Sequence, residues 1–318
     1  MAWVSECALG ELKMRMINNT IIIHPISIVL MPPSLKTDMT CRLEGKRLNV
    51  AYSDSLILQD VDFQVEDGKV TILLGPNGSG KSTLLKALAR TIEPKAGQVI
   101  LDGQSIHRQS TRSVARRLGM LPQSSSAPDG LTVRELVSLG RFPYQSLWRQ
   151  WSKHDEGAVR EAMEIADVAA FADRPVDALS GGQRQRCWIA MVLAQETDLI
   201  LLDEPTTFLD LKVQVDLLEL LVNLAHDKGR TLLIVLHDLN LAATYADTLV
   251  MMRAGKIEHV GAPEDVFTSA NLKQVFELDS QIISDPLSGR PVCIPKSGRV
   301  KSDSADLRQC ETLQAGLS

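Results

Sequence analysis

A glycine-rich run between two regular segments constrains the fold of this chain more than any other feature. The run, Gly75-Pro-Asn-Gly-Ser-Gly-Lys-Ser-Thr83, follows Val70–Leu74, a short apolar segment of the kind buried in a parallel sheet. A helical pattern extends from it over residues 81–90. The order of strand, glycine-rich loop and helix is the context of a phosphate-binding P-loop. It predicts an α/β fold built around a parallel sheet.

Each residue type in this loop suits a phosphate ligand. Glycines let backbone N–H groups surround phosphate oxygens, and the start of a helix adds the positive end of its dipole. Lys81 can supply a charge to the β- and γ-phosphates, and the Ser82 hydroxyl can ligate Mg²⁺. The expected nucleotide-binding residues of the loop are Gly75, Pro76, Asn77, Gly78, Ser79, Gly80, Lys81, Ser82 and Thr83. Alone, the loop predicts only that a nucleoside triphosphate binds.

A second apolar strand ends in two carboxylates. Leu199–Leu202 leads directly into Asp203 and Glu204. Because neighbouring side chains of a strand point to opposite faces, the two acids can take different roles. We expect Asp203 to join the shell of a Mg²⁺ ion and Glu204 to act as the general base toward the attacking water.

Composition and charge exclude several other classes of protein. The chain has 318 residues, of which 44% are hydrophobic and 23% charged, with a net charge of −5. An acidic balance argues against a nucleic-acid partner. The most apolar stretch, residues 17–31, contains Asn18, Asn19, His24 and Pro25, so it predicts neither a membrane-spanning helix nor a signal peptide. The five cysteines form no C-x-x-C pair, which favours reduced thiols in a cytoplasmic protein.

The remaining chain divides into three parts. Residues 1–38 show no clean period, so we expect a disordered extension or, alternatively, an upstream stretch that is not native, with translation starting at Met39. Residues 40–277 alternate between strands and helices, and residues 124–178 are mostly helical. Residues 278–318 form a tail in which 281–295 predicts a small hairpin. Further strands are expected at 47–52, 61–65, 118–122 and 231–236, and helices at 132–141, 154–171 and 184–195.

One short string decides the class of nucleotide-binding protein. Leu179-Ser-Gly-Gly-Gln183, just before a helical run, resembles the signature sequence of ABC (ATP-binding cassette) ATPases. Other motifs fall in the family's order. Gln123 resembles the Q-loop glutamine, Thr206–Asp210 the D-loop, His237 the switch histidine and Tyr52 the aromatic that stacks on adenine. The D-loop departs from the usual pattern by having Phe208 where a small residue is more common.

This resemblance implies a fold and a set of site residues. The fold is an α/β P-loop NTPase core with an antiparallel β subdomain and an inserted α-helical subdomain. The resemblance implies that Glu204, His237 and Gln123 are catalytic, and that Ser82, Gln123 and Asp203 hold Mg²⁺. Beyond the P-loop, it places at ATP the residues Tyr52, Ser180, Gly181, Gly182, Gln183 and Asp210.

Less specific sequence motifs resemble those of importer subunits for ferric siderophores, haem and cobalamin. They are residues 132–143, 237–246 and 285–289. The resemblance implies a head-to-tail, ATP-dependent pair of cassettes at the cytoplasmic face of the inner membrane. Two permease subunits would dock on the helical subdomain, near the apolar candidates Phe142, Trp148 and Trp151, and a substrate-binding protein would act indirectly.

Four alternatives are weighed at this point, of which the first two stay open. One is an importer ATPase for haem or cobalamin, and another is an ABC ATPase outside transport. The third, a P-loop kinase or GTPase, is disfavoured by the string at residues 179–183, and a scaffold without turnover is disfavoured because Lys81, Asp203, Glu204 and His237 are all present.

Overall fold

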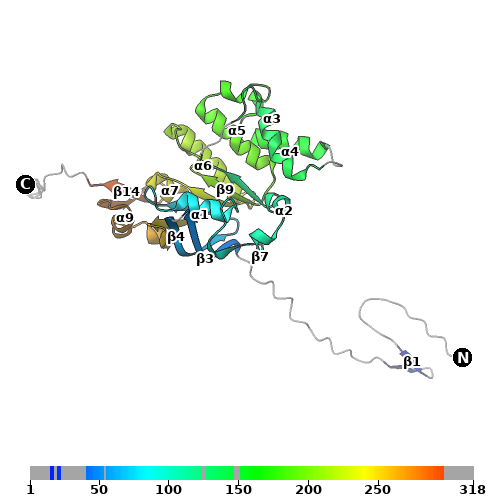
Figure 1. Ribbon diagram of the computed structural model, residues 1–318, viewed down its shortest axis with the longest axis horizontal. Coiled ribbons are helices and arrows are strands. Elements are labelled where there is room, and N and C mark those ends of the chain that lie inside the picture. Colours follow the sequence, from blue (N-terminus) through cyan, green and yellow to red (C-terminus); the bar gives the residue numbers. More distant parts are fainter. Residues whose placement is uncertain are drawn as a thin grey trace, which may run out of the picture. The chain divides into compact units, whose positions relative to one another are not determined.

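A computed structural model describes residues 15–17, 20–22, 41–53, 55–123, 127–146 and 151–296 (Figure 1). The chain divides into two units, residues 1–39 and 40–318, which we describe separately. In the first, β1 (Arg15–Ile17) pairs antiparallel with β2 (Thr20–Ile22). We did not predict this pair, because three residues are too short for a periodic pattern. The expected disorder and the alternative start at Met39 concern positions that lie largely outside the described residues.

A six-stranded sheet forms the centre of the second unit. Its strand order is β12-β11-β5-β10-β9-β8, and every pairing is parallel except that between β11 and β12. Three of its central strands are buried at every residue, as their continuous apolar sequences predict. The strand bounds are β5 Val70–Leu74, β8 Leu118–Leu121, β9 Leu199–Asp203, β10 Thr231–Val235, β11 Thr248–Arg253 and β12 Lys256–Gly261.

A four-stranded sheet covers one side of this centre, with order β4-β3-β6-β7 and antiparallel pairing throughout. Its strands are β3 Cys41–Tyr52, β4 Ser55–Glu66, β6 Ala96–Leu101 and β7 Gln104–Ser105. Leu43 and Val65 of this sheet share one apolar core with Leu84 and Leu85 of α1 (Lys81–Leu88) and with Leu201 of the main sheet. Helix α1 thus lies between the two sheets (Figure 1), as the predicted antiparallel β subdomain requires.

A helical lobe rises from the other side of the main sheet, drawn in green in Figure 1. It comprises α3 Val133–Ser138, η2 Leu139–Tyr144, α4 Lys153–Ile165, η3 Ala169–Phe171, η4 Val176–Ala178 and α5 Gly181–Ala194. The helix predicted over 132–141 turns into 3₁₀ geometry at Leu139, where Pro143 removes a backbone donor. The helix predicted over 154–171 ends at Ile165, because Asp167 adopts a left-handed φ of 56°. Helix α5 begins three residues earlier than predicted, because Ser180 caps it.

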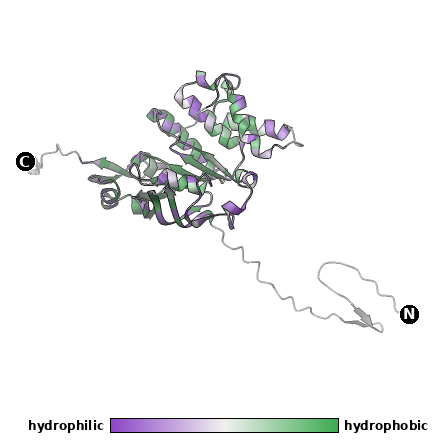
Figure 2. Cartoon of the chain, viewed as in Figure 1, coloured by the Kyte–Doolittle hydropathy of each residue, from purple (hydrophilic) through white to green (hydrophobic). Residues whose placement is uncertain are grey.

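The remaining elements complete the second unit. They are η1 Ile106–Arg108, α2 Thr111–Ala115, α6 Leu211–His226, α7 Leu239–Tyr245, α8 Pro263–Val266, α9 Ser269–Phe276, β13 Ser280–Ser284 and β14 Pro291–Pro295. Strands β13 and β14 form the antiparallel hairpin that the turn residues predict. Figure 2 shows the hydrophobic strands of the centre between helices of mixed hydropathy. Within the described residues, no helix is both long and apolar enough to cross a membrane, and Cys41, Cys187 and Cys293 are free thiols.

Candidate active site

Three loops of the main sheet meet at one edge. Strands β5, β10 and β9 are neighbours and run parallel, so the residues that follow them lie side by side. These residues are the glycine-rich loop after Leu74, His237 after β10 and Glu204 after β9. In open α/β sheets, ligands bind at the carboxyl ends of the strands. The fold therefore gathers the predicted phosphate loop and two predicted catalytic residues.

The glycine-rich loop wraps around the ammonium group of Lys81. Its Nζ donates hydrogen bonds to the carbonyl oxygens of Gly75 and Pro76, at 2.8 and 3.1 Å. Burial lowers the pKa of Lys81, and the nearby carboxylates of Glu204 and Asp203 oppose that shift. A glycine is required at position 75, because a Cβ there would lie 2.3 Å from the carbonyl oxygen of Met252. The loop thus encloses a cation and keeps its own backbone open to a ligand.

Ser82 and Asp203 form a pair with an unused oxygen. The Ser82 hydroxyl donates to Oδ1 of Asp203 at 2.9 Å, and Asp203 is only 1% exposed. Burial raises the pKa of the Asp203 carboxyl, which the hydrogen bond from Ser82 counteracts. Its Oδ2 is buried and has no hydrogen-bond partner within the described part of the chain. Hydroxyl and carboxylate oxygens, such as those of Ser82 and Asp203, are ligands that a magnesium ion prefers. Oδ2 of Asp203, which lacks a protein partner in the described structure, suits this role.

The pair does not by itself make a complete metal site. No group of three or more histidine, cysteine, aspartate or glutamate side chains that could hold a metal occurs among the described residues. Mg²⁺, however, usually takes one or two protein ligands and completes its octahedron with phosphate oxygens and water. Ser82 and Asp203 beside a phosphate-binding loop therefore fit a magnesium–nucleotide complex.

The Glu204 carboxylate is the point where polar side chains from three elements converge. Nε2 of His237 lies 2.5 Å from Oε1, and Nε2 of Gln123 donates to Oε2 at 2.5 Å. Thr207 also donates its hydroxyl to Oε2, at 3.3 Å. Glu204 is 8% exposed and has a left-handed φ of 54°, a conformation that costs a non-glycine residue energy and occurs often at functional sites. The structure thus brings together all three predicted catalytic residues.

Thr207 is the one residue of this cluster that the sequence analysis did not single out. It lies within the predicted D-loop, Thr206–Asp210, so its neighbourhood was indicated but its contact with Glu204 was not. Its hydroxyl donates to Oε2, whereas His237 contacts Oε1. Sequence spacing of three residues after Glu204 is the only signal that could have found it.

The string at residues 179–183 lies apart from the glycine-rich loop. Ser180 caps α5 in a reciprocal pair with Gln183, and Gly182 is packed so closely that a Cβ would lie 2.9 Å from Val213. Around Gly181 the space is open. No hydrogen bond or ion pair joins residues 180–183 to 75–83 in the described structure. Within one chain, these residues are not brought to the phosphate loop.

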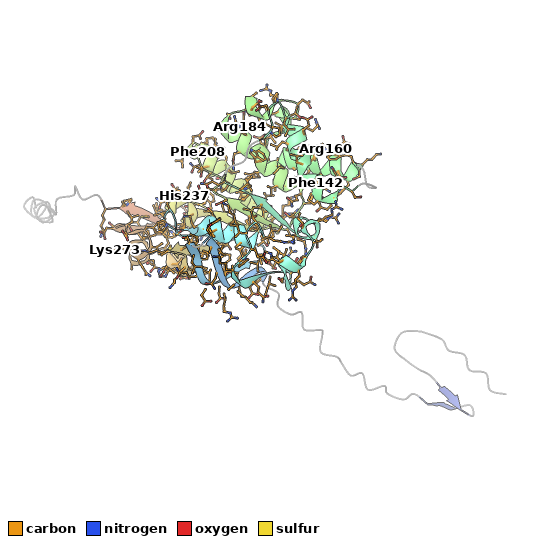
Figure 3. All side chains as sticks on the ribbon, viewed as in Figure 1. Phe142, Arg160, Arg184, Phe208, His237 and Lys273 are labelled. Atoms are coloured by element: carbon orange, nitrogen blue, oxygen red, sulfur yellow. The ribbon has the colours of Figure 1, made fainter. Side chains whose placement is uncertain are left out.

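Two further residues predicted to contact the nucleotide, Tyr52 and Asp210, lie at the end of β3 and at the start of α6. Tyr52 ends β3 with a half-exposed ring. Asp210 accepts a hydrogen bond from the backbone N–H of Val213 at 3.0 Å and so caps α6. Phe208, in the same loop, is 100% exposed (Figure 3). The nucleotide contacts of Tyr52 and Asp210 stay predictions.

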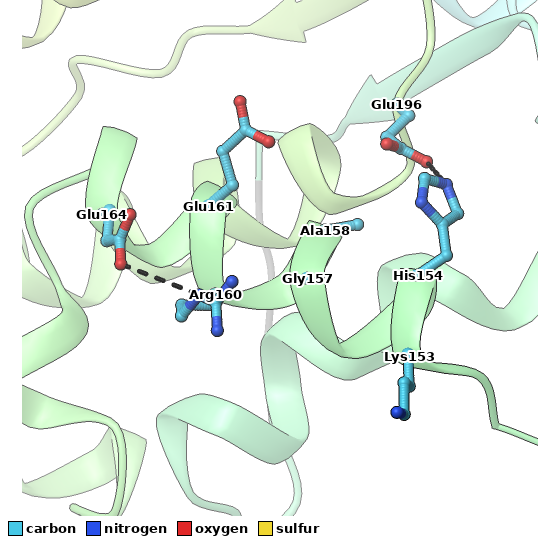
Figure 4. Close-up of a pocket in the computed structure, with 8 residues that line it drawn as sticks. All are labelled: Lys153, His154, Gly157, Ala158, Arg160, Glu161, Glu164 and Glu196. Atoms are coloured by element: carbon cyan, nitrogen blue, oxygen red, sulfur yellow. Dashed lines mark hydrogen bonds and ion pairs between the residues drawn. The ribbon is translucent and has the colours of Figure 1, made fainter.

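Exposed apolar side chains gather on the helical lobe, as predicted for docking. Phe142 is 71% exposed, and Leu139 and Trp151 are also exposed. Trp148 lies outside the described residues. A pocket on α4, drawn in Figure 4, is lined mostly by polar and charged side chains, which include Lys153, Arg160 and Glu196. It shares no residue with the cluster around Glu204 and takes no part in the site.

Comparisons with known proteins agree with this geometry. Residues 58–207 match the ABC transporter family model. The chain is 51% identical to the achromobactin transport ATP-binding protein of Dickeya dadantii, over 80% of this chain and 94% of the relative. It is 47% identical to the ferric enterobactin transport ATP-binding protein of Escherichia coli, over 85% of this chain and 99% of the relative.

A solved structure extends the comparison to the fold. A metal-chelate type ABC transporter in an inward-facing conformation matches with a TM-score of 0.71 and 30% identity. The match covers 81% of this chain and 98% of that chain. Sequence and structure therefore place this chain in the family of ABC transporter ATP-binding proteins, whose members bind and hydrolyse ATP.

Proposed function

We propose that this chain is the ATP-hydrolysing subunit of an importer for a ferric siderophore or a related iron chelate. The cluster around Glu204, beside a complete phosphate loop, carries the hydrolytic part of this proposal. The substrate class rests on the relatives, of which one transports achromobactin and another ferric enterobactin. Haem and cobalamin importers, and an ABC ATPase outside transport, are the alternatives to test.

Phosphate binding falls to the glycine-rich loop. Lys81, already held by the loop carbonyls, supplies the cation for the β- and γ-phosphates, and the N–H groups at the start of α1 complete the cradle. Mg²⁺, when bound, would neutralise charge between the phosphates, held by Ser82 and Asp203, with Gln123 as a further ligand. The half-exposed ring of Tyr52 offers a stacking surface for adenine.

Hydrolysis depends on the acceptor positions of the Glu204 carboxylate. Oε1 faces His237, and Oε2 receives both Gln123 and Thr207, so three of about four acceptor positions are engaged. The remaining position, on Oε1, can accept a proton from the attacking water. A γ-phosphoryl group in the loop gives His237 and Gln123 another oxygen to bind. Substrate binding thus prepares the base for its role.

A second copy of the chain completes the site. Ser180 and the backbone N–H groups of Gly181 and Gly182, in the first turn of α5, form a helix start that can bind an anion and that the chain's own loop does not use. In a head-to-tail pair, they would close on the γ-phosphate held by the partner. Phe208, which is fully exposed, would be covered in the same pair.

The helical lobe provides the surface for two membrane-embedded permease subunits. Leu139, Phe142 and Trp151 present apolar area that a docking segment could cover. We assign nucleotide hydrolysis to a domain over residues 40–277, permease docking to its subdomain near 124–178, and a separate tail to 278–318. A peripheral place on the cytoplasmic face of the inner membrane follows, with the substrate-binding protein acting only through the permeases.

Uptake of radiolabelled ferric siderophore tests the proposal, in cells whose native chain is replaced by the Glu204→Gln variant. We expect uptake to stop while haem and cobalamin uptake continue. Normal siderophore uptake would remove the iron assignment, and the haem and cobalamin arms would then identify the solute. If all three continue and the chain stays out of the membrane fraction, an ABC ATPase outside transport replaces the importer.

A further inference from the structure

His237 stands on a short connection whose position depends on the helix that follows it. β10 ends at Val235, Asp238 caps α7 by accepting from the N–H of Leu241 at 2.8 Å, and the helix begins at Leu239. The imidazole is exposed, so packing around the ring does not hold it. Its distance of 2.5 Å to Glu204 is therefore set by the backbone on its two sides: by Leu236, which is buried and donates its N–H to the carbonyl oxygen of Leu73, and by the start of α7.

The first turn of α7 is tied to the C-terminal hairpin by one side chain. Nδ2 of Asn240 donates to the carbonyl oxygen of Cys293 at 3.2 Å, and Oδ1 of Asn240 accepts from the N–H of Cys293 at 2.7 Å. Both backbone groups of Cys293 therefore point away from Ile282, its partner in the hairpin. The Asn240 amide, which has the donor and acceptor of a peptide group, takes the place of a further strand at this edge.

The hairpin is itself a fixed support. Cys293 is 4% exposed and packs in the main core together with Ile282. Arg290, just before β14, forms an ion pair with Glu264 of α8, at 2.9 Å. Figure 1 shows β14 beside α7, and the two elements are in contact. The start of α7 is thus attached to an element that is anchored independently of β10.

We propose that Asn240 is a positioning residue for ATP hydrolysis, which holds His237 in place by fastening α7 to the β13–β14 hairpin. This inference rests on the proposed role of His237. Asn240 contacts neither Glu204 nor the phosphate loop, so it acts through the helix alone. A displacement of about 1 Å at a catalytic group can lower a rate up to about 100-fold, whereas ATP binding depends on the separate loop around Lys81.

Steady-state hydrolysis by the full chain tests this with Asn240→Leu, which keeps the side-chain size and removes both hydrogen bonds. We expect kcat to fall about tenfold and KM for ATP to stay within about twofold. Asn49→Leu is the matched control, because the Asn49 amide also donates to one backbone carbonyl and accepts from one backbone N–H, on β3. That control should keep the parent kcat. A parent-like kcat in Asn240→Leu would overturn the proposal.

A double variant separates positioning from general damage. In a His237→Ala background, Asn240→Leu should cause no further loss of kcat, because the group it positions is gone. If the two losses multiply instead, Asn240 does not act through His237 and the proposal is wrong. If His237→Ala alone keeps the parent rate, the proposed role of His237 fails, and the inference with it. Should Asn240→Leu not fold, Asn240→Asp takes its place, because it keeps the acceptor for Cys293 and loses only the donor.

Discussion

The two ends of the main sheet differ in how their charged and polar groups are paired. At the amino ends, the residue directly before each parallel strand is charged and paired. These pairs are Lys69 with Glu66, Arg117 with Asp102, Asp198 with Arg42, Arg230 with Asp198, and Asp247 with His226. Asp102 also binds Arg42, at 2.8 Å, so three of these pairs join in one network. In the described structure, the charged residue directly before each of these strands is thus paired within the protein itself.

At the carboxyl ends, polar groups are buried without being satisfied. Oδ2 of Asp203 and the hydroxyl of Ser79 have no hydrogen-bond partner in the described structure. Glu204 adopts left-handed backbone geometry one residue further on. Such groups cost stability, and proteins retain them where a ligand will use them. The difference teaches that one edge of the sheet stabilises the fold while the other is kept ready for the nucleotide.

The largest effect is expected from Glu204→Gln at the ligand end. The amide keeps the size of the side chain and cannot accept a proton, so ATP hydrolysis should fall about 1,000-fold. ATP binding and ATP-dependent pairing should persist, because Lys81 and the helix starts are unchanged. Steady-state phosphate release and size-exclusion chromatography with ATP measure the two properties.

Asp198→Asn is the matched control for that variant. Asp198 precedes the same strand, β9, at its other end, and pairs with Arg42 and Arg230. Its loss should leave the rate of hydrolysis within about twofold of the parent, since surface ion pairs contribute little energy. Rapid ATP hydrolysis by Glu204→Gln would contradict the assignment of Glu204 as the general base. A large rate loss in Asp198→Asn would show that the two ends are not independent.

The next comparison uses two lysines: Lys69, directly before β5, and Lys81, at the start of α1 after the glycine-rich loop that follows β5. Lys81→Ala should weaken ATP binding about 100-fold, because it removes the buried ammonium group that we propose to bind the phosphates. Lys69→Ala removes only an exposed partner of Glu66 and should leave affinity unchanged. Titration with a fluorescent ATP analogue measures both affinities, and equal values for the two variants would contradict the assignment of the phosphate loop.

Local patterns in the sequence predicted strands and motifs, but they did not predict contacts between distant residues. Val70–Leu74 and Leu199–Leu202 could be predicted as buried strands, because their apolar runs are continuous and end at a glycine or an acid. The P-loop, Glu204, Gln123 and His237 could be predicted from local motifs, and the structure brings them together. Side-chain pairs between distant positions could not, because no local pattern encodes them. Arg42 and Asp198, 156 residues apart, and Asn240 and Cys293, 53 apart, are examples.

The end of helix α4 could not be predicted from the sequence either, for a related reason. The apolar period continues from His154 to Phe171, yet α4 ends at Ile165. The stop comes from one backbone conformation, at Asp167, which a helical period cannot encode. Likewise, nothing in Asp203 itself indicates that one of its oxygens lacks a partner. The buried carboxylate oxygen without a partner, which distinguishes the ligand end, emerges only when the strands assemble.

The smallest expected effect belongs to the paired end, and it concerns stability. Burial acts to raise the pKa of Asp102, but the guanidinium groups of Arg42 and Arg117 outweigh it and hold that pKa below its ordinary value. A carboxyl whose pKa is lowered by folding contributes stability above its unfolded pKa and loses it as pH falls through the folded value. Asp102→Asn should therefore lower the free energy of unfolding by about 1–2 kcal/mol at pH 7.

The pH dependence of this loss separates charge pairing from packing. The difference in unfolding free energy between parent and Asp102→Asn, measured in urea, should be constant from pH 7 to about 5 and shrink below about 4, where the parent's carboxyl takes up a proton. A difference that stays constant down to the lowest pH at which both proteins fold would mean that the side chain stabilises by packing. The kcat should match the parent throughout, because Asp102 belongs to the end of the sheet that holds no nucleotide.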